Sequence, residues 1–333
     1  MTLPTPTHTL RRRWLAQAAS FVATFAIAAA LPAQAQAQNK PELLRIGFQK
    51  SASLLTLQKS QGTLEKRLAP LGVAVKWVEF PAGPQLLEGL NVGAVDVGYV
   101  GEAPPIFAQA AGAKFVYIGN DPAAPQAEAI VVPKDSAIKS VADLKGRKVA
   151  LNKGSNVHYL LVKALEKQGL KYADIQPVFL PPADARAPFE RGAVDAWVIW
   201  DPFLAAVEKQ SGARLLVDGS GIVNNYSFYL AERGYAERYP QVIQALFEDT
   251  AARGQWLQAN LKQAAGVIAP VQGLEPDVVE RSLTRYRFGV QPLTAAVATE
   301  QQKIADVFHT LQLIPQPVRI VDALPATAHT AQK

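Results

Sequence analysis

Three consecutive residues, Gly154, Ser155 and Asn156, have the chemistry needed to hold an anion. They precede the segment 157–168, whose apolar spacing predicts an amphipathic helix. Glycine permits close backbone approach, serine and asparagine offer donors, and the N–H groups of a helix start favour negative charge. We therefore expect a small oxyanion to bind here, with simple helix capping by Ser155 or Asn156 as the alternative. His158, in the first turn, could face either a ligand or solvent.

Two acidic residues, Glu102 and Asp201, occupy equivalent places after expected strands. Either carboxylate could recognise the amine of a zwitterionic ligand, and both would repel a bare dianion. Asp201 is equally suited to cap a helix, because Pro202 follows it. Trp200 could stack on the organic part of a ligand or pack in the core. The two acids are expected in different lobes.

Motifs typical of serine hydrolases, zinc proteases, nucleotide-binding loops and dinucleotide-binding folds are absent from the sequence. The histidines that follow residue 38 are His158, His309 and His329, and no two are close in sequence. We therefore predict no catalytic residues, no metal site and no cofactor, and we expect a binding protein rather than an enzyme.

Alternating strand and helix patterns fill the first two thirds of the chain, which predicts parallel sheets with helices on both faces. After residue 231 the pattern is almost entirely helical. Expected strands lie at 43–47, 73–80, 95–100, 115–118, 128–133, 148–152, 175–180, 194–200, 214–217 and 227–230, and expected helices include 56–68, 85–91, 104–111, 157–168, 185–190, 202–209, 240–262, 263–271, 276–286 and 294–311.

An internal repeat is the most informative feature of the pattern. Residues 93–102 and 192–201 both begin Gly-Ala-Val-Asp and end in an acid, at an offset of 99. Such a period is too long for a solenoid and predicts two similar lobes. Ligands of parallel sheets bind beyond the carboxyl ends of the strands. The loops that should line a shared cleft are 49–53, 81–85, 101–105, 154–158, 183–186 and 200–202.

The first 38 residues read as a secretory signal peptide. Arg11, Arg12 and Arg13 precede an apolar run that ends in small residues, and cleavage is expected near Ala35 or Ala37. A membrane anchor is the alternative, and the Sec and Tat export routes both stay open. Removing this segment lowers the formal charge of the 333-residue chain from +6 to +3, which argues against nucleic acid as a partner.

The chain contains no cysteine, which excludes a disulfide scaffold, a thiolate metal site, a cysteine nucleophile and a thiol-anchored lipid. The mature protein is accordingly expected to be free in the periplasm, not embedded in a membrane.

Five runs of residues resemble the aliphatic sulfonate-binding proteins of ABC importers, and the likeness covers nearly all of 42–320. These runs are Phe-Pro-Ala-Gly-Pro-Gln-Leu-Leu-Glu at 80–88, Ala-Pro-Pro-Ile-Phe-Ala-Gln-Ala-Ala-Gly at 103–112, Val-Ala-Asp-Leu-Lys-Gly at 141–146, Pro-Ala-Asp-Ala-Arg at 182–186 and Val-Asp-Ala-Trp-Val-Ile-Trp-Asp-Pro at 194–202. The resemblance implies a two-lobed periplasmic binding protein of type II: an α/β fold with a mostly parallel sheet flanked by helices in each lobe, two hinge strands and C-terminal helices.

The same resemblance implies the division of the chain and its partners. Lobe 1 would comprise 42–130 and 228–325, lobe 2 would comprise 131–227, and 326–333 would be a disordered tail. The protein would be a monomer that captures a sulfonate by hinge closure and delivers it to an inner-membrane permease with a cytoplasmic ATPase, for sulfur supply.

Eleven residues form the ligand site that the repeat and the resemblance together predict. They are Gln49, Gly83, Gln85, Glu102, Ser155, Asn156, His158, Trp200, Asp201, Ser227 and Phe228. The sequence departs from its relatives at Ala103 and Val157, where hydroxyl residues are usual, so the preferred anion stays open. Other ligands to be weighed are taurine, nitrate and a thiamine-precursor-like heterocycle. Enzymes of this fold are a rival class, but the sulfinate desulfinase uses a cysteine that this chain lacks.

Overall fold

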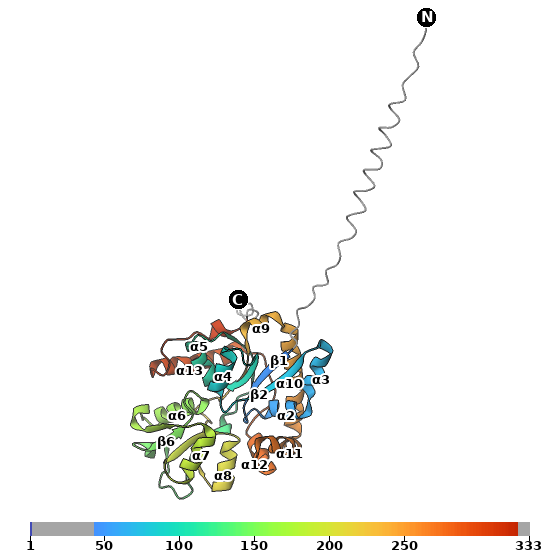
Figure 1. Cartoon of the computed structure of the whole chain (residues 1–333). Coiled ribbons are helices and arrows are strands. Elements are labelled where there is room, and N and C mark those ends of the chain that lie inside the picture. The colour runs from blue at the N-terminus through green and yellow to red at the C-terminus, as the bar shows by residue number, and fades with distance from the viewer. Residues whose placement is uncertain (2–42, 326–333) are drawn as a thin grey trace. The chain divides into compact units, whose positions relative to one another are not determined.

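Two five-stranded sheets contain all the strands of the computed structural model, which describes Met1 and residues 43–325 (Figure 1). In the first sheet β1 pairs in parallel with β2 and β3, and β10 runs antiparallel between β3 and β4. Its order is β2 (Ala74–Glu79), β1 (Leu43–Phe48), β3 (Val97–Gly101), β10 (Ser227–Glu232) and β4 (Phe115–Asp121).

The second sheet repeats this arrangement. Here β6 pairs in parallel with β7 and β8, and β5 runs antiparallel between β8 and β9. Its order is β7 (Gln176–Phe179), β6 (Lys148–Leu151), β8 (Ala196–Trp200), β5 (Glu128–Val132) and β9 (Arg214–Asp218). The predicted α/β class with two mostly parallel sheets is therefore confirmed.

Helices cover both sheets, as the alternating pattern predicts. Those of the first two thirds are α2 (Ser53–Gln61), α3 (Thr63–Leu68), α4 (Gly83–Asn91), α5 (Ala103–Ala110), α6 (Asn156–Lys167), α7 (Pro182–Glu190) and α8 (Phe203–Ser211). The single helix expected at 56–68 is wrong: it is broken into α2 and α3 at Gly62, whose φ of 59° ends the first of them in a left-handed cap.

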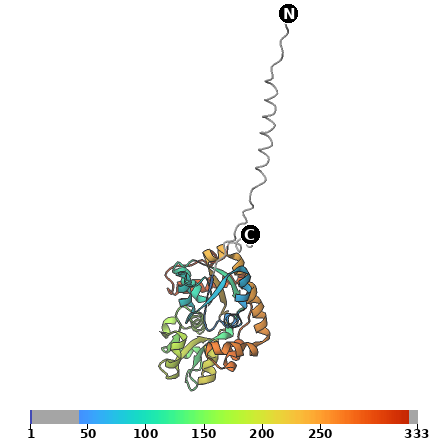
Figure 2. The same cartoon turned by 45° about the vertical axis from the view of Figure 1, so that its right-hand side comes forward.

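The predicted helical C-terminal third is confirmed. It contains α9 (Arg233–Arg238), α10 (Pro240–Ala259), α11 (Leu261–Gln272), α12 (Pro276–Leu283) and α13 (Ala295–Thr310). Helix α10 packs on α2 and α3, whereas α12 packs on α8 beside the second sheet. Figure 2 shows α10, α11 and α12, in orange, along one side of the described fold. The C-terminal third therefore contacts elements of both sheets.

The Asp of each Gly-Ala-Val-Asp repeat joins two neighbouring strands. The Asp96 carboxylate accepts hydrogen bonds from the backbone N–H of Arg45 at 2.8 Å and from its guanidinium at 2.6 Å. In the second sheet the Asp195 carboxylate accepts the backbone N–H of Lys148, also at 2.8 Å. The repeat is thus structural. Asp96, just before β3, binds the backbone of β1, and Asp195, just before β8, binds the backbone of β6.

The chain passes between the sheets twice. We call residues 122–127 the first crossing segment and 219–226 the second, because they join β4 to β5 and β9 to β10. The predicted limit of lobe 1 at residue 130 falls inside β5, which belongs to the second sheet. The described residues 43–325 belong to one compact unit. The division into two lobes remains a prediction.

Two expectations concern residues outside the described part of the chain, namely the signal peptide at 1–37 and the tail at 326–333. Over residues 43–325, none of the helices combines the length and the apolar character that crossing a membrane would require.

The two repeat aspartates should differ in their contribution to stability, because the side chain of Asp96 is 8% exposed while that of Asp195 is 37% exposed. We expect Asp96→Ala to lower the free energy of unfolding by about 3 kcal/mol and Asp195→Ala by about 1 kcal/mol, since loss of a buried charged acceptor leaves its donors unpaired. Urea unfolding of both variants checks this. Equal losses would contradict the assignment.

Candidate functional site

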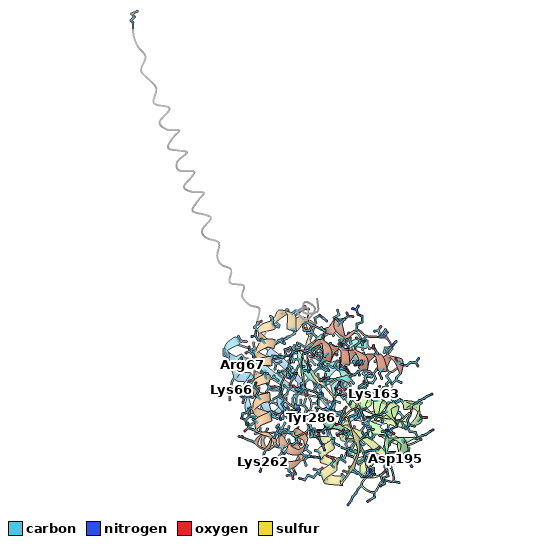
Figure 3. All side chains as sticks on the ribbon, turned by 180° about the vertical axis from the view of Figure 1, so that it is seen from behind. Lys66, Arg67, Lys163, Asp195, Lys262 and Tyr286 are labelled. Atoms are coloured by element: carbon cyan, nitrogen blue, oxygen red, sulfur yellow. The ribbon has the colours of Figure 1, made fainter. Side chains whose placement is uncertain are left out.

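A cavity lies where the two sheets meet the crossing segments, and we call it the central cavity. None of its lining residues carries a charge. They are Gln49, Ser51, Gly83, Tyr99, Gly101, Pro104, Ser155, Asn156, Trp200, Asn225, Ser227 and Tyr286. Tyr286 lies near the centre of the molecule in Figure 3.

The structure brings six of the eleven predicted ligand residues to this cavity. These are Gln49, Gly83, Ser155, Asn156, Trp200 and Ser227. These residues are far apart in the sequence. Five of them lie at or after the carboxyl ends of β1, β2, β6 and β8, and Ser227 begins β10. Their roles as ligand contacts remain a prediction, which their positions favour.

Two helices begin at the cavity from opposite sides. Gly83 starts α4 over the first sheet, and Ser155 precedes α6 over the second. Neither helix has a side-chain cap, a state that they share with every described α-helix except α9 and α13. The first N–H groups of a helix have no partner within it, and they carry the positive end of its dipole. Both helix starts can therefore donate to an anion in the cavity.

Several polar side chains of the lining have already used their hydrogens. The Ser155 hydroxyl donates to the Asn152 carbonyl at 2.7 Å, and the Tyr99 hydroxyl donates to Asp121 at 2.8 Å. Gln49 uses one of its two amide hydrogens on the Tyr99 carbonyl at 3.1 Å. An anion would consequently depend on backbone N–H groups, the second Gln49 hydrogen and serine hydroxyls such as that of Ser51.

His158 is not part of the cavity lining. Its side chain is fully buried against the rings of Tyr172, Phe179 and Phe308. Burial, reinforced by the charge of Lys153, lowers the pKa of the imidazole to about 4. The neutral Nδ1 accepts the N–H of Gly154 at 3.3 Å. His158 thus shapes the loop that leads into α6 from the core side.

Glu102 and Asp201 are both buried and committed to structural partners. The Glu102 carboxylate accepts the backbone N–H of Tyr226 in the second crossing segment at 2.8 Å. Asp201 forms an ion pair with Arg285 at 3.1 Å and accepts the N–H of Ala205 at 2.9 Å. Neither lines the central cavity. The structure thus places both acids away from the position in which they would contact a ligand amine.

Gln85 and Phe228 also lie outside the lining. Phe228 is fully buried against the Tyr117 ring, because alternate residues of β10 face opposite sides and Ser227 takes the cavity side. Six lining residues had not been predicted: Ser51, Tyr99, Gly101, Pro104, Asn225 and Tyr286. Ser51, Gly101 and Pro104 fall within the loops 49–53 and 101–105, which the repeat predicts to line the cleft. The sequence therefore carried a signal for these three residues.

A second, more apolar depression continues from the central cavity, and we call it the outer groove. It shares Gln49, Ser51 and Trp200 with the central cavity, so Trp200 stands between the two. Its other lining residues are Lys50, Glu79, Phe80, Pro81, Pro181, Pro182, Ala183 and Phe203. The groove can cover the carbon part of a ligand whose charged end lies in the central cavity.

Several carboxyl groups are buried near the crossing segments. Burial raises the pKa of Glu102 to about 8 and that of Asp121 to about 7. The pKa of Glu128 is raised well above its usual value by burial and by the charge of Glu102. Among the described residues, no three or more His, Asp or Glu side chains are grouped so as to hold a metal ion.

Comparisons with known proteins agree on one group. A family model described as NMT1/THI5 like matches residues 69–262. An aliphatic sulfonates-binding protein of Escherichia coli (strain K12) is 47% identical over 300 residues, which are 90% of this chain and 91% of that protein. The alkanesulfonate-binding protein SsuA from Xanthomonas axonopodis pv. citri, solved bound to MOPS, has 44% identity and a TM-score of 0.82, with 86% of this chain and 99% of that chain covered. The periplasmic aliphatic sulphonate binding protein SsuA from E. coli has 46% identity and a TM-score of 0.79, with 86% and 92% covered.

The raised pKa of Glu102 predicts that the protein loses stability as pH rises. Between about pH 4.5 and 8 the unfolded carboxyl has released its proton while the folded one retains it. The folded state binds more protons in this window, so the free energy of unfolding falls with pH, by about 1 kcal/mol per unit for each such group. We expect Glu102→Gln, which keeps the acceptor for Tyr226, to reduce this slope in urea unfolding from pH 5 to 8.

Asp143→Asn is the matched control. Backbone hydrogen bonds from Lys139 and Ser140 lower the pKa of the exposed Asp143 carboxyl, so its titration falls below the window. An unchanged slope in Glu102→Gln would show that this carboxyl is already ionised at neutral pH.

Proposed function

The chain belongs to the family of aliphatic sulfonate-binding proteins, and on that premise we propose that it is the periplasmic solute-binding component of an ABC importer for alkanesulfonates. The observation that supports this best is the meeting of two uncapped helix starts, those of α4 and α6, at an uncharged cavity. Such a site supplies donors from both sides without a counter-ion.

The chemistry of a sulfonate suits this site. The group carries one negative charge, three acceptor oxygens and no proton at neutral pH, so it needs donors only. Desolvation of one charge is tolerable where every oxygen receives a hydrogen bond. A zwitterion such as taurine would additionally need an acceptor for its amine. Glu102 and Asp201, the acids expected for that role, are occupied by Tyr226 and Arg285.

The outer groove favours a ligand with an organic tail over nitrate or sulfate. Trp200 and Phe203 from the second sheet face Phe80 and Pro81 from the first across this groove. Each buried methylene of a tail contributes about 0.8 kcal/mol. A tail that crosses from the central cavity into the groove would therefore gain affinity with length until the groove is filled.

Closure and delivery complete the proposal. The ligand would bind between two lobes, favour one of two pre-existing arrangements and be passed to an inner-membrane permease driven by a cytoplasmic ATPase. The mature protein would act as a monomer after export and removal of the signal peptide. It would bind its ligand and release it unchanged.

A thermal-unfolding panel tests the proposed function. Methanesulfonate and hexanesulfonate should each raise the melting temperature by mass action, whereas taurine, sulfate and nitrate at equal concentration should raise it less. Buffers must be free of sulfonates, so Tris and cacodylate are suitable. A shift produced by nitrate or a heterocycle and by no sulfonate would refute the ligand assignment.

Variants of two aromatic residues should distinguish the binding of the ligand's charged end from the binding of its tail. Phe203 lines the outer groove alone, and Trp200 lines both spaces. We expect Phe203→Ala to weaken hexanesulfonate about tenfold and leave methanesulfonate unchanged, because only the tail reaches this ring. Trp200→Ala should weaken both. Isothermal titration calorimetry provides the constants, and a loss of methanesulfonate binding in Phe203→Ala would contradict the assignment of the groove to the tail.

A further inference from the structure

The side chain of Asn156 has no hydrogen left for an anion. Its Nδ2 donates to Asn225 Oδ1 at 2.6 Å and to the Tyr226 carbonyl at 3.3 Å, and its Oδ1 accepts the N–H of Ala103 at 3.2 Å. An asparagine amide has two hydrogens, and both are used here. What remains is acceptor capacity, which a sulfonate oxygen would avoid.

Asn225 extends this set of bonds to the other crossing segment. Its Nδ2 donates to the Ala124 carbonyl at 2.8 Å, and the Ala124 N–H donates back to the carbonyl of Asn224 at 3.1 Å. Its φ of 53° lies in the left-handed region, which asparagine tolerates better than other residues with a side chain. The side chain is 6% exposed, so water does not compete freely for these bonds.

These bonds connect four segments at one point. Ala103 begins α5 on the first sheet, Asn156 begins α6 on the second, and Ala124 and Asn225 belong to the two crossing segments. Close packing accompanies the bonds, because a Cβ on Gly101 would lie only 2.1 Å from the Asn156 Oδ1 atom. Gly101, Asn156 and Asn225 also line the central cavity.

We propose that Asn156 and Asn225 form a clasp that holds the two sheets in the ligand-binding arrangement, and that Asn156 sets affinity by positioning α6 rather than by contacting the anion. This inference rests on the proposed function. The bond from the Ala103 N–H to Asn156 joins elements of different sheets, so movement of the sheets apart would have to break it, while Asn225 ties Asn156 to both crossing segments. Each bond between neutral amides contributes about 1 kcal/mol, so the clasp biases closure without making it permanent.

The clasp explains how the anion donors come together. The N–H groups of α6 point into the cavity only while its first turn stays pressed against Gly101, and α4 supplies donors from the other sheet. A protein whose binding arrangement is populated only in part binds with an affinity reduced by that fraction. Loss of the clasp should therefore weaken all sulfonates by the same factor, whatever their tail.

Asn225→Gly tests the clasp, because glycine keeps the left-handed backbone and removes both side-chain bonds. Asn224→Gly, one residue earlier in the same crossing segment, adds similar backbone freedom and is the matched control. We expect Asn225→Gly to raise the dissociation constants of methanesulfonate and hexanesulfonate about tenfold each. The ligand-free variant should also show a larger radius of gyration in X-ray scattering than wild type and Asn224→Gly.

A double-mutant cycle distinguishes positioning from direct contact. If Asn156 acts through Asn225, Asn156→Ala and the double variant Asn156→Ala/Asn225→Gly should weaken methanesulfonate by about the same factor. Multiplying losses would show that the two asparagines act independently and would overturn the proposal. So would a scattering curve of Asn225→Gly that matches Asn224→Gly. Scattering needs no ligand, so it still tests the clasp if wild-type protein binds no sulfonate and the proposed function fails.

Discussion

The physical constraint on this molecule is that an anion taken out of water must have a donor for each of its oxygens. In the proposed site the central cavity would meet this constraint without a charged side chain, through the N–H groups at the starts of α4 and α6. Those two helices rest on different sheets. Neither sheet alone can complete the set of donors, so binding and the arrangement of the sheets depend on each other.

The repeat produces this geometry by ordinary sheet rules. In each sheet a central parallel strand, β1 or β6, is held beside β3 or β8 by an aspartate at the same position of the repeat. The loops and helix starts of each sheet then gather beyond the carboxyl ends of its strands. Strand β5 follows the first crossing segment and β10 follows the second. Residues from the loops of both sheets line a single cavity.

Local pattern was sufficient to predict the fold class, the C-terminal helices and the loops that reach the cavity. It predicted Gly83, Ser155 and Trp200 because each follows a recognisable strand or begins a helix. It does not decide which way His158 faces, since a residue in the first turn is directed by neighbours such as Phe308, 150 residues away. It does not reveal the pairing of Asp201 with Arg285 either, because Arg285 lies in the C-terminal third. Tyr99, Asn225 and Tyr286 reach the cavity through tertiary packing, and no spacing in the sequence marks them.

The buried carboxyl groups fit the same electrostatic logic. Glu102, Asp121 and Glu128 lie close to the crossing segments, and burial raises the pKa of each. If they were charged, they would repel an anion entering the nearby cavity. Glu102 and Asp121 act as hydrogen-bond partners: Glu102 accepts the Tyr226 N–H, and Asp121 takes the Tyr99 and Tyr229 hydroxyls. Glu102, which the sequence places opposite a ligand amine, thus orders the second crossing segment, and Asp121 holds the Tyr99 side chain of the cavity lining.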